Sequence, residues 1–230
     1  MAGSSRRDQL AAEARRLERD GDLAGALSVW RLLADHNPRD ATARTERARI
    51  KRLLRESDEI DELLTGPPSR LAEAVDRAAQ KGNYGFVVAV RRRQVEASRT
   101  LRTLTALGSA LRRNRELAEA ETVLTEAIEL DPSKAHNPPA YTAYGSLLRE
   151  RKRLTEAREL LVEIHALHPD DPYAAEALAA VYLDIADNHR DPTLLDEAER
   201  LTRVAYKAFG RTREVSSLYG RLDSLRRQLT

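Results

Sequence analysis

Eight arginines lie between positions 91 and 115 and create the one clear charge asymmetry in the sequence. They are Arg91, Arg92, Arg93, Arg99, Arg102, Arg112, Arg113 and Arg115. The single acidic residue in this stretch is Glu96. A planar guanidinium group can hold a carboxylate or a phosphate through two parallel hydrogen bonds. The stretch therefore predicts a surface for an acidic protein partner or, as an alternative, for nucleic acid.

Side chains in patterns typical of catalysis or metal binding are missing from the sequence. It contains no cysteine, no phosphate-binding loop, no G-x-S-x-G elbow and no H-E-x-x-H pair. His165 and His168 are three residues apart, which suits a metal, but no third ligand accompanies them. Their place near a predicted helix end favours contacts with the terminal carbonyl groups instead. We therefore expect no enzyme activity, no catalytic residue, no metal site and no cofactor.

The stretch from Leu101 to Pro169 contains the same helical hairpin pattern twice, at an offset of 37 residues. Apolar and small residues recur in register within it. The equivalent pairs are Leu104 and Tyr141, Leu107 and Tyr144, Gly108 and Gly145, Leu111 and Leu148, Ala120 and Ala157, Leu124 and Leu161, Ala127 and Ile164, and Pro132 and Pro169. The turn between the copies carries three extra residues, which we place at Ala135-His136-Asn137.

Small residues in this pattern predict a close helix crossing. Leu104, Leu107 and Leu111 form one apolar stripe, as expected for an amphipathic helix. Gly108 and Ala120 lack bulk, so two antiparallel helices can approach each other there. A single hairpin leaves one face uncovered, and stacked copies are needed to bury a continuous core.

The spacing of these residues resembles the tetratricopeptide repeat, whose L-G-x₂-Y, A-x₃-F and P elements recur about every 34 residues. The resemblance implies an all-α fold in which antiparallel helical hairpins stack as a right-handed superhelical solenoid. Residues 213–229 are expected to form a C-terminal capping helix.

Less regular copies are predicted on both sides of the two clear ones. Residues 1–40 form an N-terminal hairpin with Trp30 in a packing position, and residues 41–100 form degenerate repeats or a linker. Residues 101–171 contain the two well-matched repeats. Residues 172–230 contain a divergent repeat, with about seven residues inserted around 188–193, and the capping helix.

Helix boundaries in the middle of the chain are harder to predict. A helix over 41–55 and a short piece over 58–64 lead to a break at Gly66-Pro67-Pro68. Ser69 is expected to cap the next helix, which runs through Gln80. Between Phe86 and Arg113 there is no Pro, Asn or Asp. We therefore favour one long helix over 84–113, with a tight turn near 98–100 as the alternative.

In tetratricopeptide arrays the first helix of each repeat lines a concave groove that receives a peptide or a partner helix. The resemblance places the partner-binding groove on two helices of this chain. Its predicted residues are Arg102, Thr105, Ser109, Arg112, Arg113, Thr142, Ser146 and Arg149. Pro139 and Glu150 occupy neighbouring groove positions.

The sequence thus predicts a non-enzymatic scaffold or adaptor that binds a peptide or partner helix, expected to be acidic. Nucleic-acid binding along Arg91–Arg115 and a self-associating structural subunit are the alternatives. The near-neutral net charge of +2 and the lack of interleaved aromatic residues disfavour nucleic acid. No apolar stretch is long enough for a membrane helix, and no secretory signal opens the sequence, so a cytoplasmic location is expected. The preference for arginine over lysine suggests a bacterial source.

Overall fold

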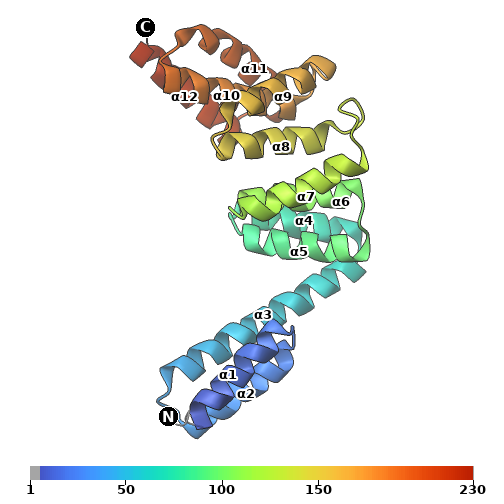
Figure 1. Cartoon of the computed structure of the whole chain (residues 1–230), viewed down its shortest axis with the longest axis vertical. Helices are drawn as coiled ribbons and strands as arrows, with labels where there is room; N and C mark the ends of the chain where they lie inside the picture. The colour runs from blue at the N-terminus through green and yellow to red at the C-terminus, as the bar shows by residue number, and fades with distance from the viewer. Residues whose placement is uncertain (1–5, 230) are drawn as a thin grey trace. The chain divides into compact units, whose positions relative to one another are not determined.

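A computed structural model describes residues 6–229, and every regular element in that range is helical. The fold is an all-α solenoid of helical hairpins (Figure 1). The chain divides into two compact units, one ending at Arg77 and one beginning at Ala78. No helix within 6–229 combines the length and the apolar character needed to cross a membrane.

The first unit is built on a three-helix core. It contains α1 (Arg6–Arg19), α2 (Leu23–His36), α3 (Ala41–Thr65) and most of α4 (Pro68–Gln80). Trp30 is 1% exposed and packs in a cluster with Ala14 and Ile50, which confirms its predicted packing role. The Trp30 ring nitrogen donates a hydrogen bond to Glu18 over 3.1 Å, so its polar atom is also satisfied.

Helix α3 is longer than the sequence analysis predicted. The expected helix over 41–55 and the piece over 58–64 are one continuous helix. Ile50, Ile60 and Leu63 are all buried on it, so its apolar face continues past the acidic residues near position 58. The predicted break is confirmed, because α3 ends before Gly66 and α4 begins at Pro68. Ser69 lies inside the first turn of α4 and does not precede it, since proline suits the first helical position.

The second unit stacks the hairpins that carry the repeat pattern. Its helices are α5 (Tyr84–Ala97), α6 (Leu101–Arg113), α7 (Leu117–Leu130), α8 (Pro138–Glu150), α9 (Leu154–Leu167), α10 (Pro172–His189), α11 (Leu195–Phe209) and α12 (Arg213–Leu229). A short 3₁₀ helix, Pro192–Leu194, precedes α11. Hairpins α6–α7, α8–α9 and α10–α11 pack on one another, and α12 packs on α10 and α11 as the capping helix.

The glycines of the repeat pattern lie where paired helices touch. A Cβ atom at Gly108 would be 2.5 Å from Leu124 Cγ, and one at Gly145 would be 2.6 Å from Leu161 Cγ. Real Cβ atoms do not approach other atoms so closely, so each leucine occupies the space that glycine leaves. The predicted close crossing is confirmed in both copies.

The turns inside five hairpins share one geometry. In each, a residue with positive φ follows the first helix: Gly21 (84°), Gly82 (71°), Arg115 (69°), Lys152 (63°) and Arg190 (53°). The next residue donates its backbone N–H to a carbonyl five positions earlier, as in Asn83 to Ala78 (2.9 Å) and Glu116 to Leu111 (3.0 Å). This pattern is the Schellman motif. The turn at Gly82 therefore has repeat geometry within the region predicted to be degenerate.

The favoured single helix over 84–113 is wrong, because the chain leaves the helical conformation at residues 98–100. Thr100 caps α6 by accepting a hydrogen bond from Thr103 N, and Thr103 Oγ1 accepts one from Thr100 N, which completes a capping box. Thr103 also donates to the Ser98 carbonyl over 2.6 Å. Side-chain hydroxyl groups thus end one helix and start the next where no Pro or Gly marks the boundary.

Insertions between the repeats take two forms. Seven residues (131–137) connect α7 to α8, against four (168–171) between α9 and α10, so the three extra residues lie in the predicted turn. Asn137 is 2% exposed there and donates to the Asp131 carbonyl. The insertion predicted around 188–193 partly lengthens α10, which continues to His189, and partly forms the connection through Asp191 and the 3₁₀ helix.

Candidate functional site

A groove of about 860 Å³ opens on the second unit. Helices α6, α8 and α10 line it, and residues from the α11–α12 turn and Tyr84 of α5 complete its walls. Among the predicted groove residues, the lining includes Thr105, Ser109, Arg112, Arg113, Thr142, Ser146 and Arg149. Arg102 is exposed near the start of α6 and is not among the lining residues.

The floor of the groove repeats from one helix to the next. On α6, Thr105, Ser109 and Arg112 lie four and three residues apart, so they share one face. Thr142, Ser146 and Arg149 repeat this arrangement on α8, 37 residues later. On α10 the equivalent positions hold Glu176 and Ala180, which lie 34 residues after Thr142 and Ser146.

Several polar atoms of this floor have no hydrogen-bond partner. They are Thr105 Oγ1, Thr142 Oγ1 and Arg112 Nε, and the Thr142 residue is only 7% exposed. A buried polar atom without a partner costs about 1–3 kcal/mol, so a polar ligand that supplied the missing bonds would gain this energy. The unpaired hydroxyl groups therefore suit a ligand with hydrogen-bonding groups, such as a peptide backbone.

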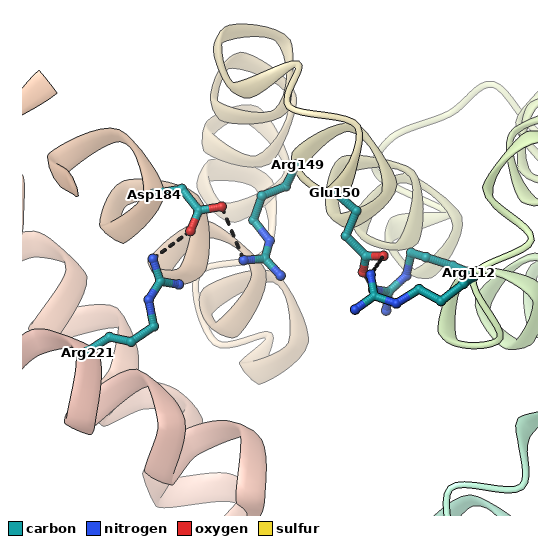
Figure 2. Close-up of polar contacts among 6 residues, drawn as sticks. Arg112, Arg149, Glu150, Asp184 and Arg221 are labelled. Atoms are coloured by element: carbon teal, nitrogen blue, oxygen red, sulfur yellow. Dashed lines mark hydrogen bonds and ion pairs between the residues drawn. The ribbon is translucent and has the colours of Figure 1, made fainter. Parts of the chain in front are cut away.

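Ion pairs join neighbouring repeats along the groove (Figure 2). Arg112 of α6 pairs with Glu150 of α8, and Arg149 of α8 pairs with Asp184 of α10 over 3.4 Å. Arg221 of the capping helix reaches the same Asp184 over 2.6 Å. We call these residues the inter-repeat ladder. Arg112 and Arg149 each contact a carboxylate of the next first helix, and Arg221 joins the capping helix to α10, so the ladder ties adjacent hairpins together.

The ladder also determines how much positive charge the groove offers. Glu150 accepts from both Arg112 and Arg115, the latter over 3.1 Å. Burial lowers the pKa of Arg112, and the Glu150 charge offsets part of that effect. The lining contains four arginines and four carboxylates, Glu150, Asp171, Glu176 and Glu214, so its formal charge is zero.

Arg113 and Tyr84 form a second feature of the groove wall. The Arg113 guanidinium donates to the Tyr84 hydroxyl over 3.2 Å and lies 5.8 Å from the centre of its ring. Burial acts to lower the pKa of Arg113, but the Tyr84 contact and the charges of Glu214 and Glu176 leave the pKa raised. Arg113 thus stays charged beside an aromatic face.

The wall opposite belongs to α10 and the α11–α12 turn. Tyr173 contacts Phe209 with ring centres 4.7 Å apart and ring planes tilted by 55°, and Tyr173 is 64% exposed. Burial raises the pKa of Glu176, and so does the nearby Glu214, while Arg113, Arg112 and Arg149 act in the opposite direction. This wall was not predicted from the sequence, because its residues come from three helices and one turn.

The arginine cluster of the sequence is largely neutralised in the structure. Arg92 contacts Glu116 and Glu119, and Arg99 contacts Glu126 over 2.5 Å, all three acids belonging to α7 or its cap. Arg93 pairs with Glu96 over 3.6 Å. With Arg112 and Arg115 on Glu150, at least five of the eight arginines contact carboxylates. The cluster is therefore not a continuous free basic surface.

His165 and His168 contact different partners. His165 Nε2 lies 3.4 Å from an Arg200 nitrogen, and His168 Nε2 lies 3.3 Å from the Lys134 carbonyl. Burial lowers the pKa of His165, as does the Arg200 charge. No group of three or more metal-binding side chains occurs among residues 6–229.

Comparison with known proteins is consistent with this repeat geometry. Residues 111–181 match the family model of the tetratricopeptide repeat. No curated protein sequence matches the chain.

Solved structures of similar fold share little sequence with the chain. A thermophilic tetratricopeptide repeat protein from Thermus thermophilus is 19% identical, covers 95% of this chain and 98% of its own, and superposes with a TM-score of 0.47. One from Parabacteroides merdae is 13% identical, with 95% and 93% covered and a TM-score of 0.49. YrrB, described as having an unusual peptide-binding site, is 16% identical, with 86% and 89% covered and a TM-score of 0.42.

Proposed function

Because residues 111–181 belong to the tetratricopeptide repeat family, we propose that the chain is a protein-interaction module that binds a peptide or helix in the groove of α6, α8 and α10. The fold itself suggests such a scaffold, since repeat solenoids present extended concave surfaces to partners. Proteins of this family are in general interaction modules and not enzymes.

The observation that carries the proposal is the set of unpaired polar atoms on the groove floor. Thr105 Oγ1, Thr142 Oγ1 and Arg112 Nε are buried and without partners. They lie on two adjacent first helices, over a groove whose size is typical of ligand sites, about 300–1,000 Å³. A bound peptide would supply carbonyl and N–H groups at these positions.

An acidic residue in the ligand stays a prediction of the sequence analysis. The groups best suited to meet it are Arg113, which forms no ion pair within residues 6–229, and the unpaired Nε of Arg112. Arg113→Glu would test this prediction, because it reverses a charge without touching the ladder. The cytoplasmic location likewise stays a prediction.

Blocking the groove tests the proposal. Ser146→Arg would fill the middle of the floor with a long charged side chain, whereas Thr155→Arg adds the same side chain at an exposed position of α9. We expect partners captured from cell extract under nuclease treatment to be lost with Ser146→Arg and kept with Thr155→Arg. Equal capture by both variants, each folded by circular dichroism, would contradict the groove assignment.

Nucleic-acid binding is the weaker alternative, because carboxylates of the same chain already contact most of the arginine cluster. If nuclease removed all captured material, and binding to arbitrary sequences fell steeply with salt, this alternative would replace the peptide groove.

A further inference from the structure

One wall of the groove has a composition unlike the rest. It contains Tyr173 and Glu176 from the first turns of α10, Phe209 from the end of α11 and Glu214 from the start of α12. We call these four residues the acidic wall. The turn between α11 and α12 brings Phe209 and Glu214 to the beginning of α10, where Phe209 meets Tyr173.

Among residues 6–229, the two carboxylates of the acidic wall form no ion pair, unlike the charged groups of the neighbouring helices. On the α6–α8 side, Arg112 and Arg115 contact Glu150, and Arg149 contacts Asp184. Glu176 and Glu214 have no ion-pair partner in the part of the chain that the structure describes. Arg113 acts on both only at longer range, because its guanidinium is held at Tyr84. Arg112 and Arg149 also act on Glu176 at longer range, but each already contacts a carboxylate of its own.

Glu176 is also partly removed from solvent, which makes the missing partner costly. Its residue is half-buried, and its charge is disfavoured by burial and by Glu214. A carboxylate in such a place gains from a cation at hydrogen-bond distance far more than an exposed carboxylate does. The equivalent positions on α6 and α8 hold uncharged threonines, so neither of those helices offers this preference.

The aromatic pair beside these carboxylates suits the stem of a basic side chain. Tyr173 exposes 64% of its surface while its ring contacts Phe209 at a tilt of 55°, so exposed aromatic surface borders the two carboxylates. Lysine and arginine have apolar stems that pack on such faces while the charged end reaches a polar group. An acidic ligand residue would instead face like charge here.

The floor next to the wall provides an independent sign of a ligand. Thr142 lies on the neighbouring helix α8, is 93% buried, and lines the groove with an unpaired hydroxyl. Its position is equivalent to that of Glu176 one repeat later. A peptide that crosses from α8 to α10 would meet first a hydroxyl that needs a hydrogen-bond partner and then a carboxylate that needs a cation.

We propose that the acidic wall is the subsite for a basic side chain, lysine or arginine, of the peptide that the groove receives. The inference rests on the proposed peptide-binding function and adds the charge of one ligand residue. If an acidic residue of the ligand contacts Arg113 as well, the ligand segment carries one basic and one acidic residue. Such a segment suits a groove lining whose formal charge is zero.

A displayed library of random 12-residue peptides, selected against the full chain, tests the inference. We expect enriched peptides to share a lysine or arginine at one fixed position. A synthetic copy of the best peptide should lose at least tenfold in affinity for the Glu176→Gln/Glu214→Gln double variant. Glu159→Gln, which removes an exposed carboxylate on α9, should bind that peptide as the wild type does.

A second peptide with norleucine at the basic position separates charge from shape. The norleucine peptide should bind the wild type more weakly than the basic peptide does, and its affinity should fall little further with the double variant. Equal losses for both peptides, or enriched peptides without a fixed basic residue, would overturn the inference.

Ser146→Arg distinguishes this failure from failure of the proposed function. If Ser146→Arg abolishes binding of a selected peptide while the double variant binds it as tightly as the wild type, the result would support the groove and contradict the basic subsite. If Ser146→Arg binds the selected peptides as tightly as the wild type, or if no peptide is enriched, the proposed groove would be contradicted. The inference of a basic subsite would then be contradicted as well.

Discussion

The two well-matched hairpins, α6–α7 and α8–α9, differ from the hairpin α10–α11 at equivalent positions in both the core and the groove. At the helix crossing, Gly108 and Gly145 meet Leu124 and Leu161, whereas the third hairpin has Ala179 in the glycine position and Thr202 in the leucine position. In the groove, Thr105 and Thr142 are replaced by Glu176.

The difference shows two kinds of change within one repeat. At the positions equivalent to the crossing, the two sizes change together: Ala179 adds a methyl group, and Thr202, smaller than leucine, donates its hydroxyl to the Ala198 carbonyl over 2.7 Å. Both residues are fully buried. In the groove no such compensation is needed, because the position lines the groove and does not lie at a helix crossing. A substitution at one core position is therefore accompanied by a substitution at the position that packs against it, whereas a groove residue can differ between repeats without a second substitution.

The largest effect is expected from breaking the core pairing. Gly145→Ala would place a Cβ atom 2.6 Å from Leu161 Cγ. We expect a loss of about 1–2 kcal/mol in the free energy of unfolding, because overpacking costs about 1–3 kcal/mol and the gain in helix propensity returns up to about 1 kcal/mol. Urea unfolding followed by far-ultraviolet circular dichroism measures this.

The reciprocal change, Ala179→Gly, sharpens that result. It should cost about 0.5–1 kcal/mol through lost helix propensity, without any clash. A Gly145→Ala protein as stable as the wild type would show that Leu161 moves aside freely, and the paired-size interpretation would be wrong.

The inter-repeat ladder should give the next largest effect. Asp184→Ala leaves both Arg149 and Arg221 without their carboxylate, and the Asp184 side chain is only 15% exposed. We expect a loss of about 1 kcal/mol, between the values for exposed pairs and for buried ones. Asp187→Ala, at an exposed site on the same helix, is the matched control and should change stability little. Equal behaviour of the two variants would mean that the ladder contributes no stability.

A smaller, stabilising effect is expected in the hairpin turns. Lys152 has a φ of 63° at the position that glycine occupies in two other turns, and its side chain is exposed. Lys152→Gly should raise the free energy of unfolding by about 0.5–1 kcal/mol, because a Cβ atom is strained in this conformation. Lys152→Ala keeps the Cβ atom and should give no such gain. A gain with alanine as large as with glycine would point to the lost charge instead of the backbone.

The smallest effect concerns pH and Glu176. Because burial and Glu214 raise its folded-state pKa, the folded chain binds this proton more tightly than the unfolded chain. The charged carboxylate therefore destabilises the fold at pH values above the folded pKa, and this penalty disappears as pH falls below the unfolded pKa of about 4.3. We expect Glu176→Gln to be more stable than the wild type at pH 7, with the difference shrinking towards pH 4. A difference that does not change with pH would contradict the raised pKa.

Much of the fold could be predicted from the sequence, because the repeat pattern reflects local requirements. The stripe of Leu104, Leu107 and Leu111, the glycine at the crossing and the prolines after the second helices each describe one helix or one helix pair. The break at 98–100 was predicted only as the alternative to a long helix, and the continuity of α3 was not predicted. The boundary at 98–100 is made by the hydroxyl groups of Thr100 and Thr103, and threonine also occurs inside helices, so it does not mark a boundary by itself. The acidic residues near position 58, in contrast, do not interrupt α3.

The candidate groove was predicted in part. Positions carried over from the repeat pattern identified most of its floor, because α6 and α8 follow the pattern closely. The acidic wall was missed, since Tyr173, Phe209 and Glu214 are brought together by the α11–α12 turn and not by a repeated spacing.

The sequence by itself determined the repeat, the helix faces and the small residues at the crossings, because these depend on spacings of a few residues along one chain segment. Only the tertiary structure decided which charges are available. Arg92, Arg99 and Arg112 look like a free basic cluster along the chain, yet Glu116, Glu126 and Glu150 lie against them in the fold. The two residues of an ion pair can lie at any distance in sequence. Whether a charged residue has a partner, as Arg92 does, or has none within residues 6–229, as Glu176 does, is therefore decided only when the hairpins stack.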